Sequence, residues 1–176
     1  MIEIILGCIV LIAIILLIFI IYHNKFQFSI IKMDEAENNI DILLQKKFDL
    51  INRSRSIIKK ELKIDDFLDN LDNNDLNFNH FEMNNFLKKN YNELFKLLDD
   101  NEKLYKNKAL VSIIEDINEN ELELVAAIKF YNDNVVTFNK LIMSFPSNII
   151  RLFFGYKKKD FYNNEKREIF EILKEK

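Results

Sequence analysis

Residues Ile4–Tyr22, which read IILGCIVLIAIILLIFIIY, decide how the rest of the chain is organised. These nineteen residues contain no charge and no proline. As a helix they reach roughly 28 Å, close to the ~30 Å hydrocarbon core of a bilayer. Because a helix satisfies its own backbone hydrogen bonds in lipid, the stretch predicts a membrane-spanning helix. We expect an anchor over residues 1–22 and one domain over residues 23–176.

Two other interpretations of this N-terminal stretch fit its residues less well. A signal peptide has a basic start and a small-residue cleavage site, whereas Glu3 is the only charge before the apolar run and no such site follows Tyr22. A lipoprotein motif at Leu6–Cys8 would close an apolar run, but these residues lie at the start of one. We therefore expect an uncleaved anchor, with Cys8 as an ordinary lipid-facing residue.

The charges that flank the apolar stretch predict its orientation. No Lys or Arg precedes it, whereas Lys25 and Lys32 follow it. Since basic residues favour the cytoplasmic side, we expect a single-pass protein of the cell membrane with its N-terminus outside and its C-terminal domain in the cytoplasm. The single Cys of the chain allows no internal disulfide, as is typical of that compartment.

The composition of the chain favours helices. Two Gly and one Pro in 176 residues leave few turn signals. A net charge of −3 gives the whole chain no nucleic-acid-binding character. We expect an all-α fold, in which the anchor is followed by an antiparallel bundle of three long helices and by short C-terminal helices.

Apolar spacing predicts where these helices lie. The first soluble helix continues directly from the anchor, because Tyr22–Gln27 contains no helix breaker. The third has apolar residues in a regular 4-3 alternation from Leu110 to Phe145, interrupted by the charge of Glu121. Pro146 ends that helix, Ser147 can cap the short helix that follows, and Gly155 ends that short helix. The expected helices cover residues 28–62, 80–106, 108–145, 148–154 and 165–175.

The segment Asp65–Asn79 is dense in Asp and Asn, which favour turns and caps. It is predicted to be a loop with one helical turn at Phe67–Leu71. A calcium loop that starts at Asn70 is the alternative. It lacks two required residues, because Asp75 stands where Gly is needed and Phe81 stands where the bidentate Glu belongs.

Several motifs in the last third of the chain occur in a fixed order. ELVAAIKFYNDNV at residues 123–135 is followed by FN, FPSN, FGY and DFY at residues 138–139, 145–148, 154–156 and 160–162. The first soluble helix adds LQKKFDLI at residues 44–51. Together these motifs resemble the LemA family. The resemblance implies a membrane-anchored antiparallel helical bundle, and it implies no particular activity or catalytic residues.

Two of these motifs suggest a polar network. Lys47 lies in or beside the apolar stripe of its helix, where a charge needs a partner. In an up-down-up bundle the first and third helices run the same way. Asp49 and Asn132 then lie at one level, each thirteen residues before its helix ends. The alternative is that all of these side chains face solvent. The candidate residues of the network are Lys46, Lys47, Asp49, Tyr131 and Asn132.

A basic and aromatic run near the C-terminus is a candidate docking surface. Such runs favour anionic lipid. However, an up-down-up bundle would place the end of the third helix about 57 Å from the bilayer. We therefore expect a surface that is solvated or docks protein. Its residues are Arg151, Phe153, Phe154, Tyr156, Lys157, Lys158 and Lys159.

The sequence contains no recognisable catalytic set. Cys8 lies in the apolar stretch, and His23 and His80 are isolated. No glycine-rich phosphate loop can form from two Gly residues, and no pattern of metal ligands is present. We expect a protein that is not an enzyme and that needs no cofactor or metal.

The leading hypothesis is therefore a membrane-anchored scaffold or protein-interaction module. The alternatives are a membrane-remodelling or envelope-stress component that acts on the bilayer, and a signalling input module whose helices shift. The expected partners are the lipid bilayer, through residues 4–22, and an unidentified protein, but no nucleic acid. The sequence leaves the oligomeric state open.

Overall fold

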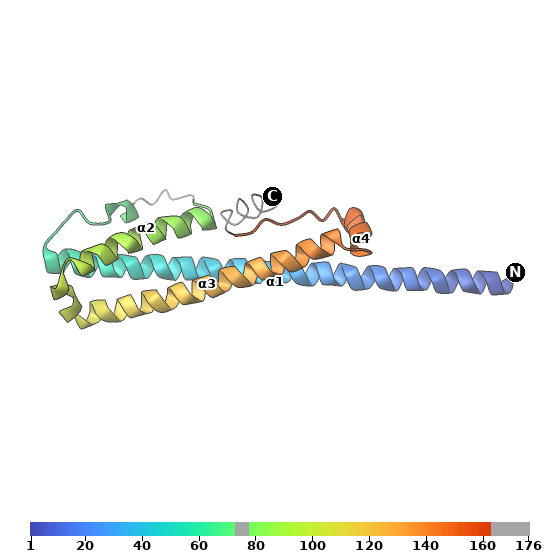
Figure 1. Cartoon of the computed structure of the whole chain (residues 1–176), viewed down its shortest axis with the longest axis horizontal. Coiled ribbons are helices and arrows are strands. Elements are labelled where there is room, and N and C mark those ends of the chain that lie inside the picture. Colours follow the sequence, from blue (N-terminus) through green and yellow to red (C-terminus); the bar gives the residue numbers. More distant parts are fainter. Residues whose placement is uncertain (73–77, 163–176) are drawn as a thin grey trace, which may run out of the picture. The chain divides into compact units, whose positions relative to one another are not determined.

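The computed structural model describes residues 1–72 and 78–162 of the chain, and these residues form only helices and connections (Figure 1). The elements are α1 (Ile2–Leu62), η1 (Asp69–Asp72), α2 (His80–Asp99), η2 (Glu102–Lys106), α3 (Lys108–Met143) and α4 (Ser147–Phe154). The all-helical class expected from the composition is confirmed for these residues. The helix predicted over residues 165–175 lies outside them.

The chain divides into two compact units. Unit 1 consists of residues 1–36 together with the chain from residue 130 onward, and unit 2 consists of residues 37–129. Both α1 and α3 contribute to each unit, so the units are described one at a time. The expected boundary at residue 22 concerns the environment of the chain, lipid or water, and it stays a prediction.

Helix α1 is unbroken from Ile2 to Leu62, which confirms that the apolar stretch continues into the first soluble helix. It is long and apolar enough to cross a membrane, and none of its most apolar segment is buried in the protein. Because exposed apolar surface of this extent is unfavourable in water, residues 4–22 are a candidate membrane span.

In unit 2, α3 runs antiparallel to α1. Asn107, next to the start of α3, donates a hydrogen bond to Glu61 near the end of α1 at 2.8 Å. Further along α3, Glu121 pairs with Lys47, which lies earlier in α1. Residue numbers thus rise along one helix as they fall along the other. The expected parallel course of the first and third helices is wrong.

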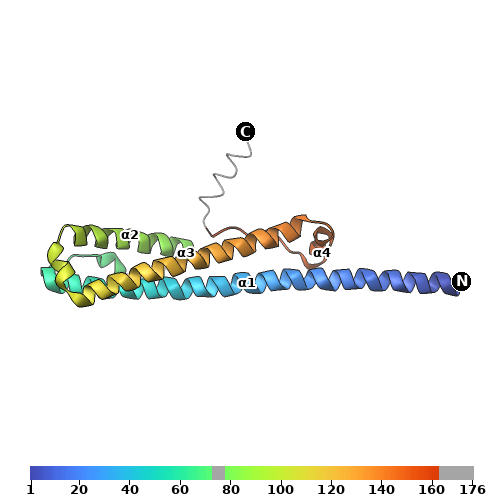
Figure 2. The ribbon, with the colours of Figure 1, turned by 60° about the horizontal axis from the view of Figure 1, so that its bottom comes forward.

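Helix α2 instead runs in the same direction as α1 (Figures 1 and 2). Its first residue, His80, contacts Asp41 at 3.0 Å, and Tyr91 lies beside Lys47 further along both helices. The reason lies in the connection after α1, which runs back along that helix. Asp69 in this connection is bound by Lys59 and by Arg55.

The core of unit 2 consists of aliphatic side chains from all three helices. The predicted stripe on α3 is buried there, apart from Glu121 and a half-exposed Ile128. Fully buried positions include Ile40, Ile51, Ile58, Leu87, Leu94, Leu98, Leu110, Ile117 and Leu124.

Helix α2 is shorter than predicted, since it ends at Asp99 instead of Lys106. It begins with a capping box, in which Asn79 and Glu82 exchange side-chain and backbone hydrogen bonds. At its other end, the Asn101 side chain donates to the Leu97 carbonyl. The Asn107 side chain then accepts from the first amides of α3. Asn side chains that bond to backbone groups in this way interrupt helices.

In unit 1, the second half of α3 again runs antiparallel to α1. The Phe26 and Phe138 rings meet edge to face at 5.6 Å, and residues after α3 contact α1 closer to its N-terminus. The α3 stripe is buried here as predicted, at Tyr131, Val135, Phe138 and Ile142. Phe145 is the exception and is 78% exposed, because the helix has already ended at Met143.

Candidate functional site

Helix α4 forms where the chain turns sharply after α3. The Ser147 hydroxyl lies 2.6 and 2.8 Å from the carbonyls of Leu141 and Ser144 and shares its one hydrogen between them. The predicted role of Ser147 as the cap of α4 is therefore wrong, since it is the first helical residue and it bonds back to α3. Gly155 ends α4 in the left-handed region, with φ of 68°, as predicted for a glycine at a helix end.

The end of α4 packs on α1 through an aromatic cluster, which consists of Phe19, His23, Phe26, Phe154 and Tyr156. The Phe154 ring lies 5.5 Å from the Phe19 ring and 4.2 Å from the His23 ring. The Tyr156 ring lies 4.6 Å from the Phe26 ring. Contacts between rings at these distances favour one geometry. They fix α4 beside the last turns of the candidate span.

Hydrogen bonds strengthen this attachment. The Tyr156 hydroxyl accepts from the Gln27 amide at 2.8 Å and lies 3.3 Å from Nδ1 of His23. Further along, the side chain of Asn139 both donates to the Lys159 carbonyl and accepts from the Lys159 amide, each at 2.9 Å. A side-chain amide that satisfies both backbone groups of one residue holds that residue in register.

The residues after α4 therefore run along α3 as an ordered tail, residues 156–162. Asn132 accepts from the Tyr162 amide at 2.9 Å, and the Tyr131 hydroxyl donates to the Asp160 carbonyl at 3.4 Å. The pairs Tyr131-Asn132 and Phe138-Asn139 of the sequence motifs thus serve one purpose, which is to hold the tail. Sequence reasoning missed this role for Asn139, although the motif in which it lies was recognised.

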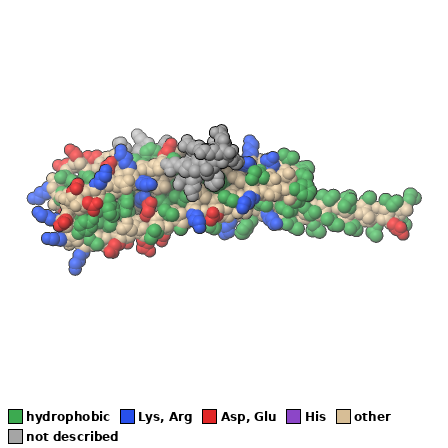
Figure 3. Space-filling model, viewed as in Figure 1, with side chains coloured by type: hydrophobic (Ala, Val, Ile, Leu, Met, Phe, Trp, Pro, Cys, Tyr) green, Lys and Arg blue, Asp and Glu red, His purple; other side chains and the backbone are tan. Residues whose placement is uncertain are grey.

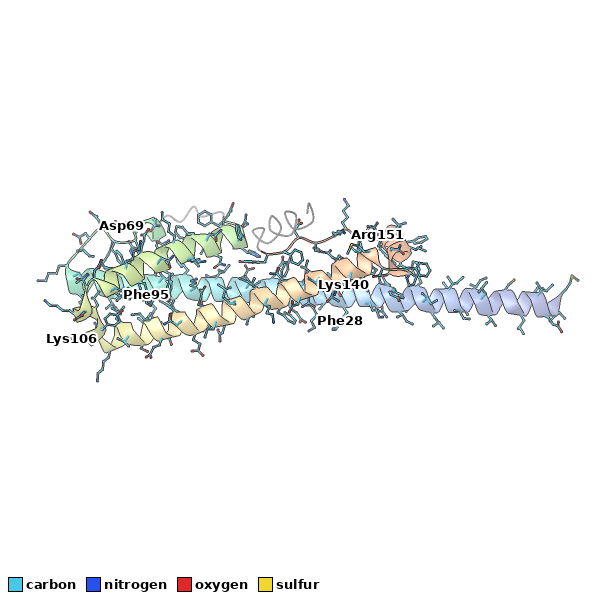
Figure 4. All side chains as sticks on the ribbon, viewed as in Figure 1. Phe28, Asp69, Phe95, Lys106, Lys140 and Arg151 are labelled. Atoms are coloured by element: carbon cyan, nitrogen blue, oxygen red, sulfur yellow. The ribbon has the colours of Figure 1, made fainter. Side chains whose placement is uncertain are left out.

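The predicted docking residues separate into two groups. Phe154 and Tyr156 are held by α1, and Arg151, labelled on α4 in Figure 4, is half-buried. Phe153 is 73% exposed, and residues 157–159 are all exposed lysines. Leu152, missed by the sequence reasoning, is 71% exposed beside Phe153. The up-down-up arrangement that placed this surface far from the bilayer is wrong, because α3 returns toward the N-terminal part of α1 and the surface contacts Phe19 in the apolar stretch.

A second polar site lies inside unit 2. Lys47 is 1% exposed, and its ammonium donates to the Glu121 carboxylate at 2.5 Å. The same ammonium lies 5.7 Å from the centre of the Tyr91 ring, a cation–π distance. Tyr91 in turn donates to Asn118 at 2.6 Å. The charge that interrupts the α3 stripe and the charge in the α1 stripe are therefore partners.

Two further polar side chains are buried in unit 2, at positions next in sequence to Tyr91 and Glu121. Asn90 and Asn120 are both 0% exposed, and the Asn90 amide donates to the Phe86 carbonyl. Burial, and then the charge of Glu121, raise the pKa of the Tyr91 hydroxyl above its usual 10.0. Polar residues inside a helical core restrict which helix registers are possible.

The five residues of the predicted polar network take different positions. Lys47 pairs with Glu121, and Lys46 lies 3.5 Å from Glu123 at the surface. Tyr131 and Asn132 hold the tail, as described above, and the Asp49 side chain is exposed. The register argument that brought Asp49 to Asn132 is wrong, because it required parallel helices. A meeting of these two residues stays a prediction.

The connection after α1 is fixed by charge. Asp69 accepts from Lys59 at 2.6 Å and from Arg55 at 2.9 Å, and Arg55 also donates to the Phe67 carbonyl. The hydrogen bonds from Lys59, and then from Arg55, lower the pKa of Asp69 below its usual 3.8. The predicted helical turn is present one or two residues later than expected, as η1.

The two histidines each contact another side chain, and the cysteine lies on the apolar part of α1. His23 belongs to the aromatic cluster, His80 contacts Asp41, and Cys8 is exposed on the apolar part of α1. Within residues 1–72 and 78–162, no three His, Cys, Asp or Glu side chains are grouped as metal ligands would be.

Comparison with known proteins adds one finding to this geometry. The model of the LemA family matches residues 36–172, which is most of the chain. The chain belongs to the LemA family. No curated protein and no solved structure matches the chain significantly. The LemA match begins after the apolar stretch and includes α2, α3, α4 and the described tail. The tail-holding residues Tyr131, Asn132 and Asn139 therefore lie inside the LemA region.

Proposed function

We propose that this LemA protein is a single-pass membrane protein whose antiparallel helical bundle acts as a non-catalytic scaffold for another protein. The observation that carries the proposal is the continuity of α1. Its apolar, unburied N-terminal part and its buried C-terminal part belong to one helix, without a break. Such a helix connects a bilayer to a folded domain without a break in the helix.

The charges of unit 1 support a cytoplasmic position for the domain. Lys25 and Lys32 follow the apolar stretch, and the lysines of the tail lie in the same unit. Basic residues at the end of a span favour the cytoplasmic side. A reporter enzyme fused after Lys176 tests this orientation. Activity restricted to the cytoplasm is expected, and activity restricted to the outside would refute it.

Unit 2 offers a surface suited to a helical protein partner. Leu122 and Val125 on α3 are 73% and 58% exposed, and they lie three residues apart on one helix face. A photo-reactive amino acid at position 122 of the full-length protein in its native membrane should form protein adducts. The matched position is Lys103, an exposed residue of η2. Equal labelling from both positions, or none from position 122, would oppose a scaffold role for this face.

The absence of catalysis is part of the proposal. His23 and His80 each have a structural partner, which supports an architectural use of these side chains. The most direct check is replacement of each histidine by Gln in the full-length protein. We expect partner adducts from position 122 to persist in both variants. If one of these replacements abolished the cellular role of the protein but left its folding and its adducts unchanged, that histidine would have a catalytic role, contrary to the proposal.

A second candidate function has specific support as well. The aromatic cluster holds α4 beside the end of the candidate span, so a protein that acts on the bilayer itself is compatible with unit 1. Vesicle leakage separates the two functions. A scaffold leaves vesicles intact at any protein density, whereas a membrane-remodelling protein permeabilises or deforms them as its density rises.

A further inference from the structure

The surface of α4 and of the tail that follows it exposes apolar and basic side chains. Neither the packing of the bundle nor the anchor accounts for them. We propose that this surface binds the headgroup region of an anionic bilayer and forms a second membrane contact beside the span. The proposal rests on the membrane anchor proposed above. It concerns the exposed side chains of residues 145–159 and the lipid next to them.

The first argument is apolar exposure that continues from the span. Phe145, Leu152 and Phe153 are each more than 70% exposed. The Phe153 ring also lies 5.5 Å from the Phe19 ring, inside the candidate span. In the space-filling view, hydrophobic side chains over α4 continue without interruption onto the apolar part of α1 (Figure 3). An apolar patch of this kind, next to a span, is stabilised by the lipid that surrounds the span.

The second argument is the local charge. Between residues 137 and 162 there are five Lys or Arg residues and a single Asp. The rest of the chain contains 20 basic and 27 acidic residues, and so has the opposite sign. Lys157, Lys158 and Lys159 are exposed and follow directly after the apolar helix. Basic side chains next to apolar ones are the arrangement by which interfacial helices recognise anionic lipids.

The third argument is the depth at which α4 is held. Its contacts on α1 fall between Phe19 and Gln27, which is where the apolar stretch ends and polar residues begin. Headgroups lie at that level if residues 4–22 span the hydrocarbon. Because Asn139 fixes the backbone of Lys159, the main chain at the end of the lysine run is held in place before any lipid binds. Less backbone conformational entropy is then lost on binding.

Continuity with the span favours lipid over protein as the occupant. A protein docked on Phe153 would have to displace lipid already present around Phe19. The attraction of lysines to anionic lipid acts over a Debye length of roughly 8 Å at physiological salt. An α4 held at the end of the span lies within that distance. A protein partner on the same surface is the competing outcome in the experiment.

The natural absence of Trp makes the contact measurable in the full-length protein. Phe153→Trp introduces one fluorophore on the exposed face of α4. The protein is reconstituted into vesicles of phosphatidylcholine, with or without phosphatidylglycerol, that contain lipids spin-labelled near the headgroup. We expect blue-shifted emission and strong quenching in anionic vesicles. Quenching should weaken in zwitterionic vesicles and at 1 M salt, where the Debye length is about 3 Å.

The lysines are tested by charge removal in the same protein. Lys157→Gln, Lys158→Gln and Lys159→Gln together should weaken lipid contact roughly 100-fold, since one lysine near an anionic surface contributes about five-fold. The matched control removes the same charge from unit 2 with Lys103→Gln, Lys106→Gln and Lys108→Gln, all exposed. This control should leave the quenching unchanged.

Three outcomes would overturn the proposal. In the first, the introduced Trp stays accessible to an aqueous quencher in all vesicles. In the second, spin-labelled lipid quenches it equally with and without anionic lipid. In the third, it is shielded from water only when a second protein is added. Flotation of the vesicles reports on the anchor separately. If the protein fails to float with the vesicles, both the anchor and this proposal are wrong. If it floats but lipid does not quench the fluorophore, only this proposal is wrong.

Discussion

Replacement of Glu121 by Ala tests the most unusual feature of unit 2. In the folded protein the ammonium of Lys47 is buried, and the carboxylate of Glu121 lies 2.5 Å away. Glu121→Ala leaves this buried cation without its carboxylate, whereas Lys47→Met replaces the cation with an apolar side chain of similar length. The two changes break the same ion pair. The geometry nevertheless predicts different consequences for stability.

The magnitude follows from the exposure of the two partners. Removal of one member of a fully buried pair costs about 3–5 kcal/mol. The Glu121 side chain is 37% exposed, so water reaches one side of the pair, and the Tyr91 ring still faces the ammonium. We therefore expect Glu121→Ala to cost about 2–4 kcal/mol. Lys47→Met should change the free energy of unfolding by less than about 1 kcal/mol, because a partly exposed carboxylate can be hydrated.

The assay is thermal unfolding of the full-length protein in detergent micelles, followed by far-UV circular dichroism. A loss of about 2–4 kcal/mol corresponds to a fall of roughly 5–15 °C in Tm for a chain of this size. The double variant Lys47→Met with Glu121→Ala removes both charges. It should recover most of the stability that Glu121→Ala loses.

Two results would refute this reasoning. One is a Glu121→Ala variant that unfolds within about 1 kcal/mol of the original protein, the size of an exposed ion pair. The other is a Lys47→Met variant that is less stable than Glu121→Ala. Either result would mean that the Lys47 ammonium is hydrated in the folded protein.

Three further predictions concern the core, the tail and the connection after α1. Leu124→Ala should cost about 2–5 kcal/mol in unfolding free energy, whereas Leu122→Ala on the exposed face should cost less than about 0.5 kcal/mol. Asn139→Ala should increase the rate of tryptic cleavage in the tail. The control Asn134→Ala changes a residue that bonds to Phe130 and not to the tail, and it should leave the rate unchanged. Equal cleavage rates in the two variants would exclude the tail contact. Because its pKa is lowered on folding, Asp69 contributes to the free energy of unfolding. This contribution is fully present above the usual pKa of 3.8 and is lost as the pH falls through the lower pKa of the folded protein. In Asp69→Asn this loss of stability at low pH should be smaller. The free energy of unfolding is measured by urea titration at a series of acidic pH values, and the same pH dependence in both proteins would contradict the ion pairs of Asp69.

Local features of the sequence were sufficient for much of the fold. The unbroken α1 followed from the lack of a breaker in Tyr22–Gln27. The buried stripe of α3 followed from its spacing, and the end of α4 followed from Gly155. Each of these features depends on side chains that are near each other in sequence. The early end of α2 was missed because Asn101 acts through a backbone bond that apolar spacing does not report.

The direction of α2 could not be read from the sequence. The Asp- and Asn-rich segment after α1 indicates a connection but not its course. That course depends on Asp69 meeting Arg55 and Lys59, which lie near the end of α1 and precede Asp69 by 14 and 10 residues. The partner of Lys47 was missed for the same reason. The need for a counter-charge was evident from the stripe, but Glu121 becomes its neighbour only when α3 runs antiparallel to α1.

The course of α3 back along α1 is the central claim, and a cross-link measures it directly. In a Cys8→Ser background, His23→Cys with Phe154→Cys places two thiols where the parent rings lie 4.2 Å apart. A short bismaleimide should join them in membranes at high yield. Glu3→Cys with Phe154→Cys is the control, since Glu3 lies about 30 Å further along α1. Efficient cross-linking of the first pair alone is the predicted result. No cross-link at position 23, or an equal yield at position 3, would contradict the account.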